Sequence, residues 1–204
     1  MSKFSNICVF LLYSVCACAQ ALYSDSALYA AYTAEDMSVW KRYIESVDFA
    51  AVSLREQERC LSYEFGYVAA AIDADTQDAQ SSLCRFEDHI GLLTPVMPQA
   101  TILAYRSALA AYKVKTGQSV VSNAFKAFHF ANKAYDADSL NTTALTIRGN
   151  VLFFAPSIAG GNKRQALLCF RRAASIYEER GDTICSWEYA AIRMWINQCE
   201  EKIK

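Results

Sequence analysis

The side chains that could carry out chemistry are few and scattered along the chain. Its 204 residues include only two histidines, His89 and His129, and no two cysteines after the first 20 residues have the CxxC spacing of a zinc site. His129 lies between two phenylalanines, which favours packing, and His89 lies near a predicted helix end, which favours a contact with the helix dipole. No serine has the sequence context of a nucleophile elbow. The sequence therefore predicts no catalytic residue, no metal site and no cofactor, and we expect a protein that is not an enzyme.

One short segment has the composition of an anion-binding loop. Gly160-Gly161-Asn162-Lys163 precedes a predicted helix, whose first backbone amides could meet an anion. The segment lacks the spacing and the Lys-Ser/Thr ending of a nucleotide-binding loop, so a turn followed by Asn162 as helix N-cap is the preferred interpretation. The net charge of −1 and the scattered lysines and arginines also predict no binding of nucleic acid.

The first residues have the pattern of an export signal. Lys3 supplies a positive charge, residues 7–15 are apolar but too short to span a bilayer, and residues 17–19 have the small-x-small form that signal peptidase accepts. We expect cleavage before Gln20, so that residues 1–19 form a signal peptide.

A lipoprotein signal is the alternative, in which Cys18 is lipidated and becomes the first residue of the mature chain. Both alternatives place the protein in the periplasm, and the second adds a membrane anchor. No later segment reaches about 18 unbroken apolar residues, so residues 20–204 are predicted to form one helical domain without a transmembrane segment.

Export would allow disulfides to form, and one pair of cysteines has a suitable spacing. Cys60 and Cys84 lie on either side of a predicted turn at residues 73–76. An antiparallel helical hairpin would bring them to the same level, which makes a disulfide geometrically possible. Two free thiols are the alternative, because equal height does not make the side chains face each other.

The elements that must position all these residues are helices. The chain has only seven glycines and three prolines, and 53% of its residues are hydrophobic, which favours long helices joined by short turns. The pattern Ala-x3-Phe-x2-Ala-x3-Tyr occurs twice, 42 residues apart, with its side chains on one helix face. Its two copies are Ala124, Phe128, Ala131 and Tyr135, and Ala166, Phe170, Ala173 and Tyr177. Such a repeat is typical of a helical solenoid.

The repeat predicts about three helix pairs with capping helices at both ends. The pairs are residues 53–72 with 76–90, 99–114 with 119–137, and 141–154 with 163–179, and the caps are residues 24–32, 34–47 and 184–203. Small and aromatic residues recur where paired helices would approach closely. These structural repeat residues are Gly66, Ala110, Ala124, Phe128, Ala131, Gly149, Ala166, Phe170, Ala173 and Ala191.

The third pair resembles a tetratricopeptide repeat. Gly149, Leu152, Ala166, Phe170 and Ala173 match the small, large, small, aromatic and small positions of that family. The resemblance implies an all-α fold in the form of a right-handed α–α superhelix. It is incomplete, because an arginine at position 148 stands where the family prefers leucine.

The loop within this pair carries a second resemblance. Ala155 to Lys163, with its proline and paired glycines, resembles an uncharacterised envelope group of exported bacterial tetratricopeptide-like proteins. It is similar, more loosely, to helical periplasmic proteins that assist solute transporters. These resemblances imply a fold and a compartment rather than an activity.

The predicted binding surface is the concave side of the solenoid, which the first helix of each pair would line. Grooves of this kind bind an extended peptide or a partner's helix. Repeat position predicts that six side chains point there: Thr146, Asn150, Phe153, Glu188, Ile192 and Trp195.

We therefore expect a protein-binding scaffold of the bacterial cell envelope with a protein or peptide partner. The alternative is a small-ligand-binding accessory protein of a transport system, with the ligand near Phe153 and the loop at residues 155–162. An open groove would favour the scaffold, and a closed apolar pocket with a few polar groups would favour the ligand-binding protein.

Overall fold

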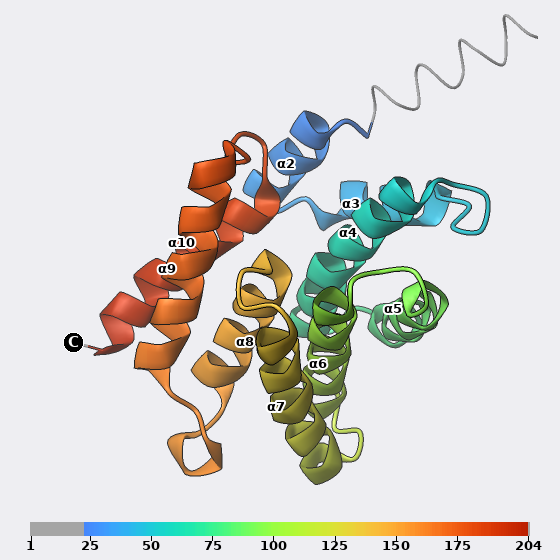
Figure 1. Ribbon diagram of the computed structural model, residues 1–204. Coiled ribbons are helices and arrows are strands. Elements are labelled where there is room, and N and C mark those ends of the chain that lie inside the picture. Colours follow the sequence, from blue (N-terminus) through green and yellow to red (C-terminus); the bar gives the residue numbers. More distant parts are fainter. Residues whose placement is uncertain (1–22, 204) are drawn as a thin grey trace, which may run out of the picture.

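The described part of the chain is entirely helical. We analysed a computed structural model, which describes residues 23–203, so the predicted signal peptide at 1–19 and the lipidation site at Cys18 lie outside the described residues. The helices are α2 (Asp25–Thr33), α3 (Met37–Ser46), α4 (Leu54–Asp73), α5 (Ala79–Leu93), α6 (Gln99–Lys115), α7 (Val120–Ala137), α8 (Thr142–Phe154), α9 (Lys163–Arg180) and α10 (Trp187–Ile203), with a short 3-10 helix at Ser157–Ala159 (Figure 1). The all-α prediction is confirmed. None of these helices is long and apolar enough to cross a membrane.

Local capping signals explain where the helices begin. The side chains of Ser53, Asn141 and Asn162 accept hydrogen bonds from backbone amides three residues further on and so cap α4, α8 and α9. Gly181 ends α9 in the left-handed conformation with φ of 74°. The predicted helix bounds therefore agree with the observed ones to within a few residues.

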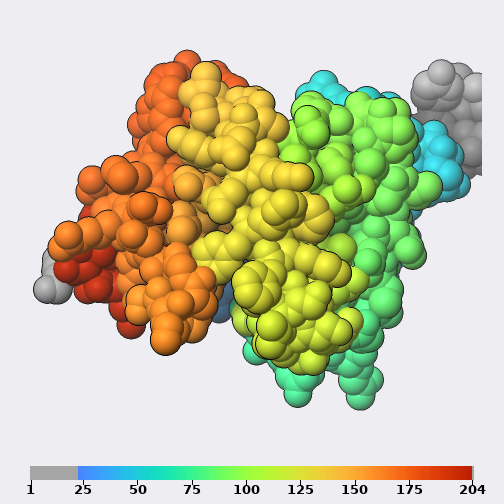
Figure 2. Space-filling model, turned by 60° about the horizontal axis from the view of Figure 1, so that its bottom comes forward, coloured from blue at the N-terminus to red at the C-terminus, as the bar shows by residue number. Residues whose placement is uncertain are grey.

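Neighbouring helices pack as hairpins in chain order, α4 with α5, α6 with α7 and α8 with α9. In the space-filling view, α5–α6, α7 and α9 follow one another across one face, from green through yellow to orange (Figure 2). The first helices of the pairs run in the same direction. The last residues of α4 and α6, Asp73 and Lys115, lie side by side and form an ion pair. At the opposite end, Asn141 before α8 donates a hydrogen bond to Thr101 near the start of α6, at 2.9 Å.

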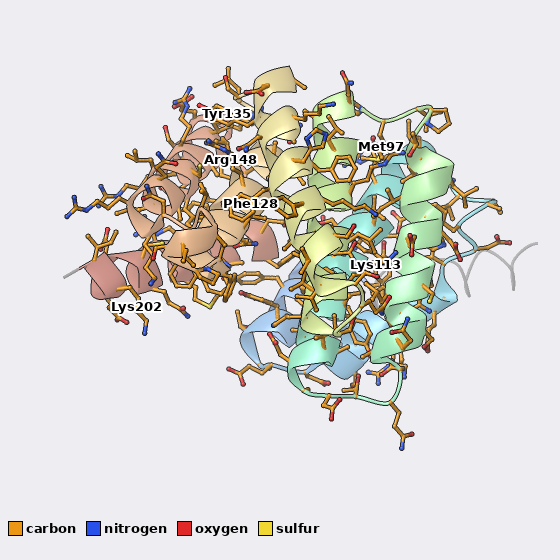
Figure 3. All side chains as sticks on the ribbon, turned by 90° about the horizontal axis from the view of Figure 1, so that it is seen from below. Met97, Lys113, Phe128, Tyr135, Arg148 and Lys202 are labelled. Atoms are coloured by element: carbon orange, nitrogen blue, oxygen red, sulfur yellow. The ribbon has the colours of Figure 1, made fainter. Side chains whose placement is uncertain are left out.

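The third pair shows the close helix approach that its small residues predict. A Cβ atom on Gly149 would lie 2.6 Å from the ring of Phe170 in α9, so only glycine allows this approach. Ala166 and Ala173 are buried beside that phenylalanine. Arg148, the departure from the family pattern, places its guanidinium 4.4 Å from the ring centroid of Tyr135 (Figure 3).

The first copy of the repeat pattern, on α7, does not pack in the same way as the second copy on α9. Its buried face consists of Asn123, Ala127, Ala131 and Ala134, whereas Ala124 and Phe128 are only half-buried. The prediction that Ala124 and Phe128 pack as their counterparts in α9 do is therefore wrong. The reason is that α7 packs mainly on α6 and leaves Phe128 lining a cavity.

Of the two alternatives for Cys60 and Cys84, the structure has the free thiols and not the disulfide. Cys60 is buried, Cys84 is exposed, and both thiols are free. Because one cysteine is buried and the other exposed, the two side chains lie on different faces of the hairpin, whereas a disulfide needs Cβ atoms that point toward each other.

Candidate functional site

A cavity of about 890 Å³ lies on the side of the molecule where the four parallel helices α4, α6, α8 and α10 face one another. We call it the cup. The N-terminal helices α2 and α3, the inner side of α7 and the loop after α8 complete its wall. Its volume lies within the range of about 300–1,000 Å³ that is usual for small-molecule sites.

One end of the cup is closed because α10 returns to the N-terminal helices. Figure 1 shows the start of α10 beside α2. The ring centroid of Trp187, the first residue of α10, lies 5.0 Å from that of Trp40 in α3 and 6.1 Å from that of Tyr32 in α2. Ser62 of α4 donates a hydrogen bond of 2.6 Å to the Glu188 carboxylate. These contacts join residues more than 120 positions apart and hold the start of α10 against the middle of α4 and the N-terminal helices.

Glycine makes this closure possible at one point of α4. A Cβ atom on Gly66 would lie 2.6 Å from the ring of Trp40 and 3.0 Å from the ring of Trp187. The two indoles therefore meet over the bare backbone of α4. The small residue that the repeat predicts at this position serves the closed end of the cup rather than the packing of its own hairpin.

The other end of the cup is exposed to solvent. The ion-paired side chains of Asp73 and Lys115 lie there, at the ends of α4 and α6. Phe154 at the end of α8 is 61% exposed and packs its ring 5.2 Å from that of Trp195. Ile158 in the following loop is 98% exposed. The rim therefore combines an ion pair with exposed apolar side chains.

The loop after α8 is part of the wall, but it is not an anion site. The amides of Gly160, Gly161 and Asn162 donate to the carbonyl oxygens of Ser157, Pro156 and Leu152, and Asn162 caps α9. A Cβ atom on Gly161 would lie 1.8 Å from the carbonyl oxygen of Ala155, so the glycine is required for the tight turn. The preferred interpretation from the sequence, a turn followed by an N-cap, is confirmed.

The electrostatics of the cup favour neutral groups. Burial raises the pKa of the Glu188 carboxyl, while the hydrogen bond from Ser62 lowers it. Burial also raises the pKa of the Tyr105, Tyr112 and Tyr177 hydroxyls, which keeps them protonated. Among the described residues, the lining has three carboxyl groups, on Glu58, Asp73 and Glu188, against the single ammonium group of Lys115.

Four of the six predicted site residues line the cup: Thr146, Asn150, Glu188 and Trp195. Phe153 and Ile192 do not, since both are buried in the core that α8, α9 and α10 share. Their predicted placement on the concave side is wrong, because α9 covers the helix faces that carry them. The wall of the cup also includes Tyr32, Met37 and Trp40 of the N-terminal helices, which the sequence predicted only as caps.

Comparisons with known proteins give a structural relative and no sequence family. No family model matches the chain, and no curated protein matches it in sequence. Among solved structures, it is similar to the HusA haemophore from Porphyromonas gingivalis, with a TM-score of 0.54 and 17% identity over 91% of this chain and 94% of that chain. This likeness supports the helical fold over nearly the whole chain.

Proposed function

We propose that the protein is a non-enzymatic binding protein that holds a flat, largely apolar ring ligand of about tetrapyrrole size in the cup. The observation that carries the proposal is the closure of the helical array by Trp187 and Trp40, which makes a cavity of about 890 Å³ with one closed and one open end. An extended peptide needs a groove that continues past both ends, whereas a compact ring needs a bounded aromatic pocket. The geometry therefore favours the small-ligand alternative over the scaffold.

The structural relative supports the same class of ligand. The HusA protein is a haemophore, and haem is a flat ring with an apolar body. Its likeness to this chain covers 91% of the residues. We propose export to the periplasm for this chain as well, on the pattern of residues 1–19, with lipidation at Cys18 as the alternative.

The residues of the cup suit the ring better than its metal. Haem iron is usually held by histidine, cysteine, methionine or tyrosine. In the described part of the chain the lining has three methionines and four tyrosines but neither histidine nor cysteine. Burial raises the pKa of Tyr105, Tyr112 and Tyr177, which opposes the phenolate form that would bind iron. We expect stacking and apolar burial to provide most of the affinity, so that a metal-free porphyrin binds as well.

The test is a titration of the purified protein with haemin and with protoporphyrin IX. Binding would be followed by the Soret band and by quenching of tryptophan fluorescence, because Trp40, Trp187 and Trp195 all line the cup. We expect saturable binding of one porphyrin per chain. No saturable binding of either compound would contradict the proposal.

Two matched variants locate the ligand. Ala70→Trp places an indole in the wall of the cup and should weaken binding at least tenfold, whereas Ala137→Trp at the exposed end of α7 should leave it unchanged. Equal affinities of the two variants would place the ligand outside the cup.

A protein partner is the second candidate, and the exposed apolar rim favours it. Phe154 and Ile158 are largely exposed beside the open end, where a partner that delivers or receives the ligand would dock. Crosslinking of the tagged protein in its native envelope, followed by mass spectrometry, would test this. A dominant partner that is lost in Ile158→Ser would support it, and a partner retained by that variant would contradict docking at the rim.

A further inference from the structure

The lysines and arginines are scattered along the chain, but the acidic residues are not. Residues 89–135 and 139–177 contain ten lysines and arginines and no aspartate or glutamate. All 21 acidic residues lie outside these two segments, and the net charge of the whole chain is −1. The two segments include α6, α8, nearly all of α7 and most of α9. One part of the fold is therefore basic within a protein that is nearly neutral.

The outer side of α7 combines exposed cations with exposed apolar side chains. Lys126 and Lys133 are exposed, and Val121 and Phe125 are 71% and 74% exposed. Ala131 on the opposite side of the helix is buried, so α7 is anchored in the fold by that side. Its outer side is left without a neighbour that covers these apolar residues.

The start of α9 continues this surface. Lys163 and Arg164, the first two residues of α9, are both exposed. A Cβ atom on Gly160, in the loop before α9, would lie 3.4 Å from the ring of Phe128 in α7, so this loop lies against α7. Helices α7 and α9 also share the face that Figure 2 shows, in yellow and orange. We call the following exposed residues the basic face: Val121, Phe125, Lys126, Lys133, Lys163 and Arg164.

The four cations of the basic face form no ion pair with any residue that the structure describes. Lys113 and Arg171 of the same acid-free segments differ, because they pair with Glu87 and Glu200 on neighbouring helices. The unpaired cations give the basic face a local excess of positive charge, which attracts an anionic partner.

The surface of a bilayer with anionic lipids matches both parts of this face. Lipid phosphates cover such a surface, so cations at separate positions on two helices each meet one. A protein partner would instead need acidic residues at four matching positions. The headgroup region also accepts apolar side chains such as Val121 and Phe125, which lie beside the cations on α7.

We propose that the basic face docks the protein on the surface of an anionic phospholipid bilayer, with Val121 and Phe125 among the headgroups and the four cations on lipid phosphates. Ala124 and Phe128 of the same helix line the cup, so docking places the cup next to the membrane. The inference goes beyond the proposed function and needs no ligand. With an apolar ligand in the cup, docking brings that ligand to a phase in which it dissolves.

The test is flotation of lipid vesicles mixed with the purified chain from Gln20 onward, which lacks the apolar residues 7–15 and carries no lipid. Vesicles of phosphatidylcholine with about 30% phosphatidylglycerol are compared with vesicles of phosphatidylcholine alone. We expect binding to the anionic vesicles to be at least about tenfold stronger, and to weaken at high salt, because salt screens exposed charges.

Two matched double variants test the position of the charges. Lys126→Gln combined with Lys133→Gln removes two charges from the basic face and should weaken binding to anionic vesicles about tenfold, equal to about 1.4 kcal/mol. Arg42→Gln combined with Arg55→Gln removes two exposed charges from α3 and α4 and should leave binding unchanged. The two variants have the same net charge, so a difference between them reports the place of the charges.

A second matched pair tests the apolar part of the face. Phe125→Ser should weaken binding to anionic vesicles about fivefold, because the side chain no longer enters the headgroup region. Leu92→Ser on α5, where the leucine is 62% exposed, should leave binding unchanged. All the replaced side chains are exposed, so the melting temperatures should stay close to that of the wild type, which excludes unfolding as the cause of a loss.

Four results would overturn the inference: no binding to anionic vesicles, equal binding to both kinds of vesicle, equal losses in the two double variants, or unchanged binding of Phe125→Ser. A soluble acidic protein that is crosslinked only when Lys126 and Lys133 are present, without vesicle binding, would also overturn it and make the basic face a protein-docking surface. The porphyrin titration uses no lipid and the flotation uses no porphyrin, so the proposed function and this inference fail separately.

Discussion

Replacement of Gly149 by alanine tests the helix contact on which the third pair depends. The new Cβ atom would lie 2.6, 2.8 and 3.0 Å from three atoms of the Phe170 ring. That ring is 0% exposed and stacks on Trp195 with a centroid separation of 6.4 Å, so it has no free space into which it could move. Overpacking of this kind costs about 1–3 kcal/mol.

Alanine also has a higher helix propensity than glycine, which offsets part of this cost. A matched variant measures that gain in stability separately. Alanine stabilises a helix interior by about 0.8–1.0 kcal/mol relative to glycine. Gly91 in α5 is exposed and a Cβ atom there would have no neighbour within 4 Å, so Gly91→Ala should gain up to about 1 kcal/mol. In Gly149→Ala the same gain in helix propensity offsets part of the overpacking cost, so the free energy of unfolding should fall by about 0–2 kcal/mol. The free energies of unfolding of the two variants should therefore differ by about 1–3 kcal/mol.

Thermal unfolding followed by circular dichroism would measure that difference. At about 2–4 °C per kcal/mol for a chain of this size, Gly91→Ala should melt a few degrees above Gly149→Ala, with a gap of at least about 2 °C. If both variants gained the same stability, α8 and α9 would not be in close contact at this position, and the argument for the repeat residues would fail.

Two further predictions concern the walls of the cup. Burial raises the pKa of Glu188 above its ordinary value of 4.5, so the folded state binds its proton more tightly than the unfolded state, and its cost to stability grows as the pH rises through that raised value. Glu188→Gln should therefore be more stable than the wild type at pH 7 in urea denaturation, with the advantage vanishing toward pH 4, and an advantage that does not depend on pH would contradict this. Tyr112→Phe removes a hydrogen bond of 2.8 Å to the carbonyl oxygen of Phe65, which joins α6 to α4. It should cost about 1 kcal/mol in the same assay, and unchanged stability would show that this bond does not contribute.

The positions of the helices could be predicted because their signals are local. The side chains of Asn141 and Asn162 each accept a hydrogen bond from the backbone amide three residues further on and so cap a helix. Gly181 ends α9 through its own backbone conformation. The contact between Gly149 and Phe170 was predictable too, since both residues belong to one hairpin with a recognisable repeat pattern. Each of these features is determined by residues that lie within a few tens of positions of one another in the sequence.

The site was predicted only in part, because a repeat pattern does not show which face of a helix remains uncovered. Thr146, Asn150, Glu188 and Trp195 line the cup, whereas Phe153 and Ile192 lie under α9. Phe128 and Ala124 follow the same spacing as their counterparts in α9 and yet face the cavity. Equivalent sequence positions thus have different surroundings in successive pairs.

The sequence by itself determined an all-helical chain, the bounds of its helices and the parallel set of first helices that offers a concave side. It did so because helix periodicity, caps and small residues act between neighbours in the chain. Only the tertiary structure decided that this side is a closed cup, since the closure depends on Trp40 meeting Trp187 and Ser62 bonding to Glu188 across more than 120 residues. Whether two residues so far apart in the sequence come into contact depends on the packing angles between all the helices that lie between them. No local pattern in the sequence specifies the combined effect of those angles.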